Sequence, residues 1–431
     1  MEHVVIIGNG IAGVTAARHI RKLSDKKITI ISGESEYFFS RTALMYVYMG
    51  HMKFEHIQPY EHRFWKENQI NLVKAYVAQI DVHAKSLHLL DGEVISYDQL
   101  IIASGSRSNT FNWPGQNLAG VTGLYTKSDL ENLEKFTPAC KSAVVVGGGL
   151  IGIELTEMLL SRNIKVVFLV REKSFWDAVL PEGESQMLNR HIREHGVDLR
   201  LETELKEIIA DESGRVESVL TGKGEIIPCQ IVGLAAGVSP NIEFLRGSGI
   251  EIEMGVKVNR FLETNIEHVY SIGDCAEQLQ ALPNRKAIEA VWYTGRMMGE
   301  TVAQTICGNR MKYNPGNWFN SAKFLDIEYQ TYGWIWPKAR ENEVHYYWEH
   351  ASGRKCIRIS YDKNTSAFLG INTFGIRMRH EFFDGAINDN RSVDYIIDNL
   401  SRANFDPEFY SKYEPEIQSL FYQTYSHTVK L

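Results

Sequence analysis

Cysteines are few in this sequence, and their spacing excludes several kinds of redox and metal site. Only 5 of the 431 residues are cysteine, and no two of them are spaced as Cys-x2-Cys or Cys-x4-Cys. Local disulfide redox pairs, structural zinc sites and iron–sulfur sites depend on such spacings, so none of them is expected here. We expect buried, small hydrophobic side chains at all five positions, which are Cys140, Cys229, Cys275, Cys307 and Cys356.

Long apolar runs and blocks of positive charge are also missing. No stretch reaches the roughly 18 uninterrupted apolar residues of a membrane span, so no integral membrane segment is expected. The formal net charge is −7, and no cluster of Lys or Arg suggests a nucleic-acid partner. Residues 1–3 lead directly into an apolar strand without a basic segment or a cleavage site. We therefore expect no secretory signal and a cytoplasmic location.

The most informative feature present is a pair of glycine-rich turns of the same type. One is Gly-Asn-Gly-Ile-Ala-Gly at residues 8–13, and the other is Gly-Gly-Gly-Leu-Ile-Gly at residues 147–152. Each follows an apolar strand and precedes a helix-like stretch, where the first glycine permits a tight turn and the second lets a pyrophosphate approach. The phosphates would then bind N–H groups at a helix N-terminus. Two such turns predict two bound dinucleotides, and the simplest chemistry that needs both is hydride transfer from a nicotinamide to a flavin.

Around each turn the pattern predicts a βαβ unit with a parallel sheet. The first has strands at residues 4–7 and 28–31 around a helix at about 12–23, and the second spans about 142–172. Glu34 lies near the position where an acid bonds the ribose of the adenosine. A solvated loop acid is the alternative for Glu34.

The last hundred residues change character. Ser392 is expected to cap a helix over residues 393–400. The aromatic residues of this region suit either an interface or a plain core. The histidines, including His380 beside Glu381, show no metal-ligand spacing in this interpretation, and no metal is predicted. Strands are expected at residues 324–332, 344–349, 356–361 and 367–374.

In this order the pieces resemble the pyridine nucleotide–disulfide oxidoreductase superfamily of flavoproteins, over about residues 1–333. The landmarks are the two glycine turns, the strand end at 103–105 (Ala-Ser-Gly) and the segment 271–274 (Ser-Ile-Gly-Asp). The resemblance implies an α/β fold with two Rossmann-like three-layer dinucleotide-binding domains and a C-terminal α+β domain. The expected boundaries are 1–113 with 248–312 for the FAD domain, 114–247 for the NAD(P) domain, and 313–431.

One departure from the superfamily narrows the expected reaction. Its disulfide reductases carry a redox cysteine after the second strand, where this chain has Thr42. The segment is more similar to the ferredoxin, rubredoxin and nitrite reductase flavoproteins and to the apoptosis-inducing-factor group, which Arg41 and Leu44 match. Tyr46 stands where those relatives have a lysine paired with a glutamate that corresponds to Glu154. A Tyr46–Glu154 hydrogen bond in place of that ion pair would leave less positive charge nearby and thus a higher pKa for Glu154 than in those relatives. Simple packing is the alternative for Tyr46.

The motifs and the resemblance together assign the candidate site residues. Expected to be catalytic are Glu154, Tyr46 and Arg41. Expected to bind FAD are Gly8, Gly10, Ile11, Ala12, Gly13, Glu34, Arg41, Val77, Ala103, Ser104, Gly105, Arg107, Gly273, Asp274, Trp318 and Phe319. Expected to bind NAD(P)H are Gly147, Gly149, Leu150, Ile151, Gly152, Arg171 and Gly237.

Several of these assignments have alternatives. Arg107 could form a surface ion pair, and Trp318 and Phe319 could belong to an aromatic core. Arg171 favours NADPH, because an arginine at this strand end accommodates the 2′-phosphate, whereas Glu172 beside it would repel that phosphate. NADH and dual use therefore remain open.

Without a protein disulfide, the electrons are expected to pass to an external acceptor. A small iron–sulfur protein such as a rubredoxin or ferredoxin is the main prediction, and a homodimer is expected. The alternatives are a membrane quinone reductase, an oxidase that forms hydrogen peroxide, and a redox sensor or scaffold like the apoptosis-inducing-factor group.

Overall fold

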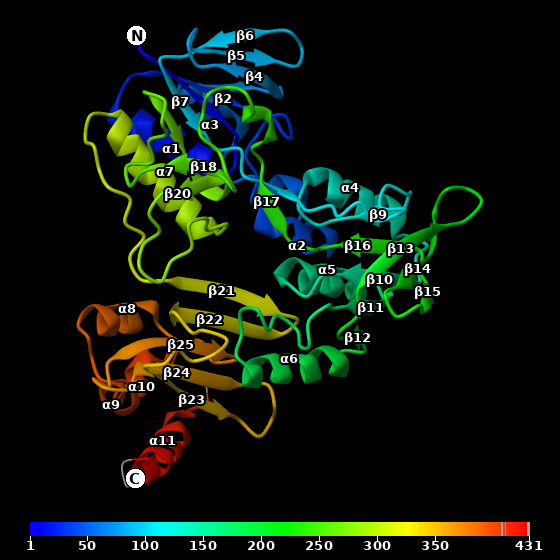
Figure 1. Cartoon of the computed structure of the whole chain (residues 1–431), viewed down its shortest axis with the longest axis vertical. Helices are drawn as coiled ribbons and strands as arrows, with labels where there is room; N and C mark the ends of the chain where they lie inside the picture. The colour runs from blue at the N-terminus through cyan, green and yellow to red at the C-terminus, as the bar shows by residue number, and fades with distance from the viewer. Residues whose placement is uncertain (407, 410, 429–431) are drawn as a thin grey trace. The chain divides into compact units, whose positions relative to one another are not determined.

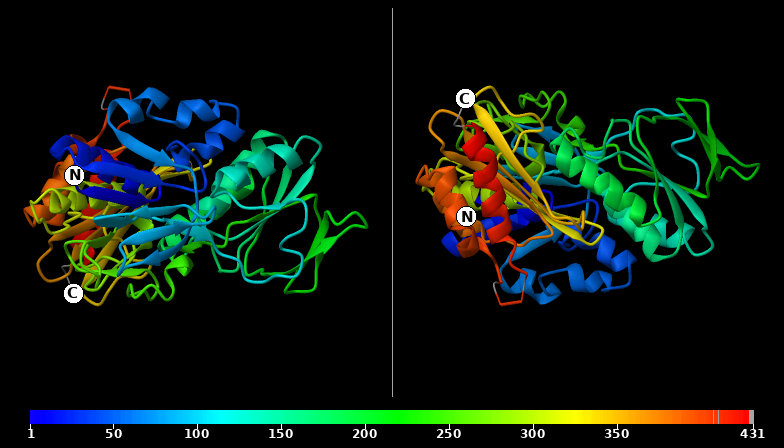
Figure 2. Two further views of the ribbon diagram at one scale, coloured as in Figure 1. Left: turned by 90° about the horizontal axis from the view of Figure 1, so that it is seen from above. Right: turned by 90° about the horizontal axis from the view of Figure 1, so that it is seen from below.

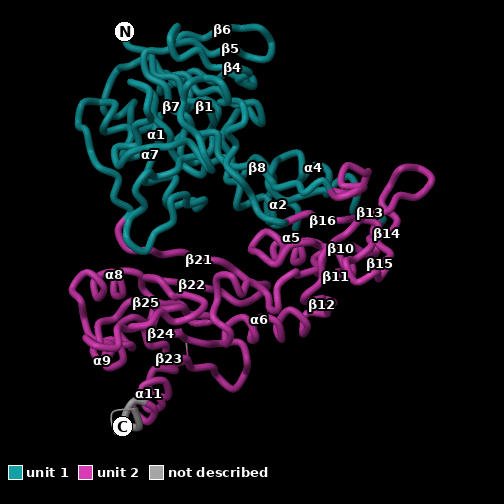
Figure 3. The backbone as a smooth tube through the Cα atoms, in the orientation of Figure 1, with its two compact units in different colours: residues 1–112, 122–139, 236–315 teal, residues 113–121, 140–235, 316–431 magenta. Residues whose placement is uncertain are grey.

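The computed structural model of the chain describes residues 1–406, 408–409 and 411–428 (Figure 1). The chain divides into two compact units, each assembled from separate segments (Figure 3). The first unit comprises Met1–Asn112, Thr122–Ala139 and Ala236–Pro315. The second comprises Trp113–Val121, Cys140–Ala235 and Gly316–Leu431.

The first unit is built on a five-stranded parallel sheet. In sheet order its strands are β19 (Val269–Ser271), β7 (Gln99–Ile102), β1 (His3–Ile7), β2 (Lys27–Ile31) and β3 (Ile70–Val73). Strands β19, β7, β1 and β2 are largely apolar and buried along almost their whole length, as expected of parallel strands with both faces covered, whereas the edge strand β3 is partly exposed. Helices α1 (Ile11–Leu23) and α7 (Trp292–Ile306) pack closely together, because Gly299 lacks a side chain beside the backbone of α1.

Smaller elements complete this unit. Strands β4 (Val77–Asp81), β5 (Ser86–Leu89) and β6 (Val94–Ser96) form an antiparallel sheet. Two further sheets have two strands each. One pairs β8 (Ser106–Ser108) with β17 (Val238–Pro240) in antiparallel fashion, and the other pairs β18 (Val256–Val258) with β20 (Ala276–Gln278) in parallel. Helices α2 (Leu44–Tyr48), α3 (His62–Glu67) and α4 (Lys127–Phe136) lie in the connections.

The second unit begins with another sheet of the same kind. Its order is β12 (Asp198–Arg200), β11 (Lys165–Leu169), β10 (Ser142–Val146), β16 (Ile231–Leu234) and β9 (Val121–Thr122). The first four of these strands are parallel. Helix α5 (Leu150–Ser161) follows β10, and α6 (Glu182–Glu194) follows β11. The remaining strands, which form an antiparallel sheet, are β13 (Leu205–Ala210), β14 (Val216–Thr221) and β15 (Ile226–Pro228).

The C-terminal part of this unit is an antiparallel sheet with helices. In sheet order the strands are β21 (Phe319–Phe324), β22 (Ile327–Gly333), β25 (Phe368–Phe374), β24 (Cys356–Asp362) and β23 (Glu343–Glu349). The helices are α8 (His380–Asn388), α9 (Val393–Asp398), α10 (Leu400–Ala403) and α11 (Glu414–Thr428). Helix α11 lies against this sheet (Figure 2), where the Tyr346 hydroxyl donates to the Ile417 carbonyl at 3.1 Å.

The predicted fold class is confirmed, with two local corrections. The strand expected over residues 324–332 begins only at Ile327, because Leu325, at φ 57°, and Asp326 form the turn of a hairpin between β21 and β22. The helix expected over residues 393–400 ends at Asp398, and α10 follows it. Its predicted cap is confirmed, because the backbone N–H of Tyr395 donates to the Ser392 hydroxyl at 3.2 Å. Within the described ranges, no helix is both long and apolar enough to cross a bilayer.

Candidate dinucleotide-binding sites

Each of the three glycines in the first glycine turn has its own structural role. Gly8, which follows β1, has φ 109°, and a Cβ atom there would lie 2.1 Å from the Ala103 carbonyl oxygen. A Cβ atom on Gly13 would lie 2.1 Å from the Gly8 carbonyl oxygen, so this glycine lets α1 pack on β1. A Cβ atom on Gly10 would meet nothing described within 4 Å. The middle glycine therefore faces open space, where a pyrophosphate can approach the free N–H groups of α1.

The second glycine turn repeats this geometry at the end of β10. Gly147 has φ 119°, and a Cβ atom on Gly152 would lie 2.1 Å from the Gly147 carbonyl oxygen. Gly149 precedes α5, and a Cβ atom there would meet none of the described atoms within 4 Å. In both turns the first glycine thus has a positive φ, the third leaves no room for a side chain and the middle one is open, which fits two dinucleotides.

Asp274 lies beside the first turn, at the carboxyl end of the same sheet. It follows β19, and the Ser106 hydroxyl donates to its Oδ2 at 3.1 Å. Its neighbour Gly273 has φ 75°, and a Cβ atom there would lie 2.9 Å from the Cβ of Ala12. Burial raises the pKa of Asp274 above the usual range of an aspartate. The carboxyl ends of the strands in an open α/β sheet are where such folds bind ligands, and a buried carboxylate there suits a polyol chain.

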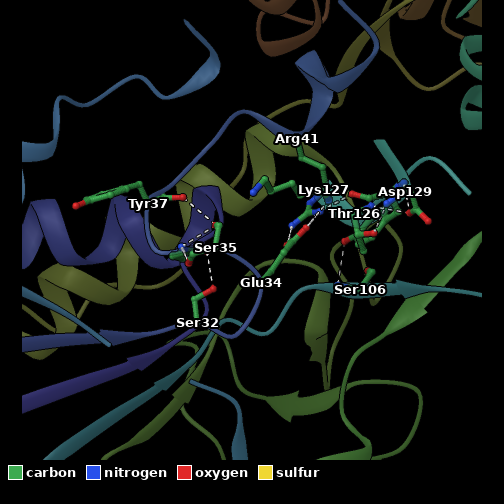
Figure 4. Close-up of polar contacts among 11 residues, drawn as sticks. Ser32, Glu34, Ser35, Tyr37, Arg41, Ser106, Thr126, Lys127 and Asp129 are labelled. Atoms are coloured by element: carbon green, nitrogen blue, oxygen red, sulfur yellow. Dashed lines mark hydrogen bonds and ion pairs between the residues drawn. The ribbon is translucent and has the colours of Figure 1, made fainter. Parts of the chain in front are cut away.

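Glu34 and Arg41, which the sequence assigned to separate roles, form one ion pair (Figure 4). Nη2 of Arg41 lies 2.6 Å from Oε2 of Glu34, and Nη1 lies 3.1 Å from Oε1. The backbone N–H of Lys127 also donates to Oε1 of Glu34 at 2.8 Å. Arg41 further donates to the Tyr125 carbonyl and lies 4.6 Å above the Tyr125 ring. The guanidinium is therefore fixed in place, and the ribose contact of Glu34 stays a prediction.

Asp129 holds the segment that Arg41 contacts. Its Oδ2 accepts from the backbone N–H groups of Tyr125 at 2.9 Å and of Thr126 at 2.8 Å. In return, the Thr126 hydroxyl accepts from the Asp129 backbone N–H at 3.0 Å, which completes a capping box at the start of α4 (Figure 4). The Tyr125 hydroxyl accepts from the backbone N–H of Ser106 at 3.2 Å. This network thus joins Arg41 to the loop that also positions Asp274.

Glu154, which lies near the start of α5, has a strongly raised pKa. Burial raises the pKa of Glu154 to about 7, and the nearby Glu157 adds to this shift. Glu157 itself is paired with Lys323, whose Nζ lies 2.7 Å from its Oε1. A carboxyl group that titrates near neutral pH is characteristic of functional sites. Tyr46 lies in α2 of the first unit, so its hydrogen bond to Glu154 stays a prediction.

The remaining polar candidates have partners on the protein. Arg107 lies 3.7 Å from Oε1 of Glu243, which is the surface pair expected as its alternative. Arg171 lies 3.1 Å from Oε1 of Glu172, and its side chain is 72% exposed. An exposed pair of this kind opens at little cost, so Arg171 is accessible to a nucleotide.

The aromatic and small candidates stay predictions. Trp318 stacks on Trp334 with ring centroids 4.7 Å apart, and Phe319 contacts the His380 ring at 4.7 Å. Val77 begins β4, and Gly237 has φ 87°. The predicted residues Ile11 and Ala12 lie in the first turn of α1, and Leu150 and Ile151 lie in the first turn of α5.

The structure also brings together three residues that the sequence analysis left out. His191 and His195 lie four residues apart at the end of α6, and Asp326 lies beside both. The statement that the histidines lack metal-ligand spacing was therefore wrong. The signal that could have found the two histidines is the spacing His-x3-His, since residues four apart share one face of a helix.

Comparison with known proteins agrees with this geometry. Residues 2–299 match the family model described as pyridine nucleotide-disulphide oxidoreductase. The chain is 29% identical over 326 residues to a rhodocoxin reductase of Rhodococcus erythropolis, covering 74% of this chain and 76% of the relative. It is 32% identical over 339 residues to the 5,5′-dehydrodivanillate O-demethylase ferredoxin reductase subunit of a Sphingobium species, covering 76% and 81%.

The fold is also similar to that of solved structures. A ferredoxin reductase from Rhodopseudomonas palustris superposes with a TM-score of 0.80 at 22% identity, covering 87% of this chain and 91% of that chain. At this level of identity the similarity shows the shared fold.

Proposed function

Because the chain belongs to the pyridine nucleotide-disulphide oxidoreductase family, it is an FAD-dependent oxidoreductase of NAD(P)H, and we propose that its electrons pass to a small iron–sulfur protein. The observation that supports the hydride transfer is the pair of matched glycine turns, each with a positive φ at its first glycine, no room for a side chain at its third and open space at its middle one. Two dinucleotides on one chain fit hydride transfer between them. Similarity to a ferredoxin reductase subunit supports the choice of acceptor.

The roles of the residues follow from their positions. When bound, FAD supplies a hydride acceptor that can release electrons one at a time. The N–H groups at the start of α1 would bind its pyrophosphate, and Asp274 would accept hydrogen bonds from its polyol chain. The N–H groups at the start of α5 bind the pyrophosphate of NAD(P)H. Glu154 positions the nicotinamide amide, and proximity then provides most of the rate.

We propose NADPH as the preferred donor, with NADH also used. Val170 occupies the position after β11 where an acid would bind the 2′-hydroxyl of NADH, and it is fully buried. Arg171 follows it and is 72% exposed. The guanidinium can leave Glu172 for a 2′-phosphate, because the exposed pair is weak.

We further propose a cytoplasmic homodimer, in which residues 313–431 provide either the dimer contact or the docking surface for the acceptor. The aromatic content of this region supports an interface. Sedimentation equilibrium of the flavin-loaded protein tests the dimer, and a single species at 49.1 kDa would contradict it.

An anaerobic titration of the purified yellow protein tests the reaction itself. We expect stoichiometric bleaching of the flavin band by NADPH, with NADH slower. The reduced protein is then mixed with a rubredoxin, a ferredoxin, a soluble quinone or oxygen in parallel. Fast reoxidation by an iron–sulfur protein supports the proposal. Faster reoxidation by quinone or oxygen would favour the corresponding alternative, and no bleaching would overturn hydride transfer altogether.

A further inference from the structure

Three side chains that the proposed reaction does not use converge at one place in the second unit. His191 and His195 are one helical turn apart at the end of α6, with ring centroids 4.4 Å apart. Asp326 comes from the turn between β21 and β22, and its Oδ1 lies 2.6 Å from Nε2 of His191 and 3.4 Å from Nε2 of His195. One ligand atom from each residue therefore lies within 4.8 Å of the others.

His191 has a buried ring without satisfied hydrogen bonds. Its side chain is 0% exposed. Within the described chain, neither of its ring nitrogens makes a hydrogen bond of good geometry, although Nε2 lies so close to Asp326. Buried polar side-chain atoms normally have a partner. The buried His191 imidazole can therefore take a ligand beside Asp326.

His195 is oriented as a ligand by the backbone of its own helix. Its Nδ1 lies 2.9 Å from the His191 carbonyl oxygen, and only a protonated Nδ1 can donate to a carbonyl. This tautomer leaves the lone pair of Nε2 free on the side that faces Oδ1 of Asp326. Ligating histidines are commonly fixed in this way through their second ring nitrogen.

Asp326 is presented to the two rings by an unusual turn. Leu325 precedes it with φ 57°, a conformation that is rare for a bulky residue, and the leucine side chain is only 4% exposed. Burial of Leu325 fixes the turn and leaves Asp326 at its tip. Arg354 Nη1 lies 3.8 Å from Oδ2 of Asp326, so the other oxygen, Oδ1, is the one directed at both imidazoles.

We propose that His191, His195 and Asp326 bind a divalent cation of the zinc type, which links the end of α6 to the β21–β22 hairpin. Two imidazoles and one carboxylate suit Zn²⁺ and Co²⁺, whereas Mg²⁺ and Ca²⁺ prefer oxygen ligands. Tetrahedral ligands at about 2.1 Å from an ion lie roughly 3.4 Å apart. The distance between His195 and Asp326 has this value, and Asp326, whose side chain is 57% exposed, can withdraw from His191. Water completes the coordination.

Calorimetric titration with ZnCl2 tests the site on untagged, flavin-loaded protein that has been treated with EDTA and dialysed. We expect one ion per chain. His195→Gln and Asp326→Asn each remove one ligand, and each is expected to weaken binding about 100-fold or more. His83→Gln, an exposed histidine in the first unit, is the matched control and should bind Zn²⁺ like the wild type.

Thermal unfolding gives a second readout that does not depend on enzyme activity. Zn²⁺ binds the folded state, so it should raise the Tm of the wild type and of His83→Gln but not of the two ligand variants. Flavin content and circular dichroism in EDTA show that the variants fold. The proposal is overturned if the wild type does not bind Zn²⁺, if His195→Gln and Asp326→Asn bind it equally well, or if Mg²⁺ binds as tightly.

Discussion

Arg358 and Glu184 form a buried ion pair that joins β24 to α6. Nε of Arg358 lies 2.8 Å from both carboxylate oxygens of Glu184, and Nη2 lies 2.8 Å from Oε2. The two side chains are 11% and 0% exposed, and Asn372 donates to the same carboxylate at 3.4 Å. Each buried charge is compensated by the other. If one of the two side chains is removed, the remaining charge is buried without a partner.

Arg358→Ala should therefore destabilise the protein strongly. Removing one member of a buried pair leaves the other charged and desolvated, which costs about 3–5 kcal/mol. The exposed pair of Arg200 and Asp198, with side chains 41% and 48% exposed, provides a control, and Arg200→Ala should cost about 1 kcal/mol or less. Urea unfolding followed by fluorescence compares the two. Equal effects would show that the buried charges do not depend on each other.

Substitutions in the first glycine turn should separate folding from flavin binding. Gly10→Ala places a methyl group in the open space that a pyrophosphate would fill, so the variant should fold with nearly normal stability but retain little flavin. Gly13→Ala places a Cβ atom 2.1 Å from a backbone oxygen, so it should lower the stability as well. Bound flavin per chain and the Tm in the absence of flavin are the two measurements. Wild-type flavin content in Gly10→Ala would remove this turn from the FAD site.

Glu154→Gln should change how stability depends on pH. The pKa of Glu154 is raised by burial to about 7 in the folded protein, above the 4.5 of an ordinary glutamate. The unfolded chain therefore ionises this group more easily, and the associated stability is present below about pH 4.5 and is lost as pH rises to about 7. Glutamine stays neutral, so the variant should gain Tm relative to the wild type at pH 8 and little at pH 4.5.

The same substitution should affect the reaction of the proposed enzyme. Glu154 changes its charge near pH 7, so the rate of flavin reduction by NAD(P)H should show an inflection there in the wild type. Stopped-flow measurements between pH 5.5 and 8.5, a range chosen to span about 7, should find that Glu154→Gln lacks this inflection. An unchanged profile would place Glu154 away from the nicotinamide.

Arg171→Gln should change the choice of donor. Loss of the guanidinium removes the contact with a 2′-phosphate, and a charge-assisted hydrogen bond is worth about 1.5–3 kcal/mol, or at least about 10-fold in kcat/KM. The kcat/KM for NADPH should fall by this factor, while the kcat/KM for NADH should change little. Glu172→Gln is the matched variant. It should raise the kcat/KM for NADPH, because it removes the carboxylate that lies 3.1 Å from Arg171 and competes with the 2′-phosphate. Equal losses for both donors would contradict the assignment.

Features encoded by neighbouring residues could be predicted from the sequence. The glycine turns could be predicted because the spacing of Gly8, Gly10 and Gly13 depends only on the backbone conformation of one short segment. Ser392 was found as a helix cap for the same reason, since its partner Tyr395 lies only three residues away. Both depend on the conformation of one short segment and not on the rest of the chain.

Features that depend on distant segments could not be predicted. The ion pair of Glu34 and Arg41 is completed by the backbone of Lys127, which is remote in sequence. The turn at Leu325 contradicts the preferences of leucine and exists because tertiary packing buries that side chain. The spacing of His191 and His195 was visible, but the third member of that cluster, Asp326, becomes adjacent only in the folded chain.

The division of the chain into interleaved segments has a consequence for biosynthesis. The first unit contains the Gly8 turn but also needs β19, Asp274 and α7, and it ends only at Pro315. A ribosome makes the glycine turn almost at once, yet the strand that completes the parallel sheet emerges after most of the second unit's nucleotide-binding sheet has been translated. The β7 edge of this sheet therefore has no β19 to pair with until residues 269–271 emerge, and we expect flavin capture to follow that step.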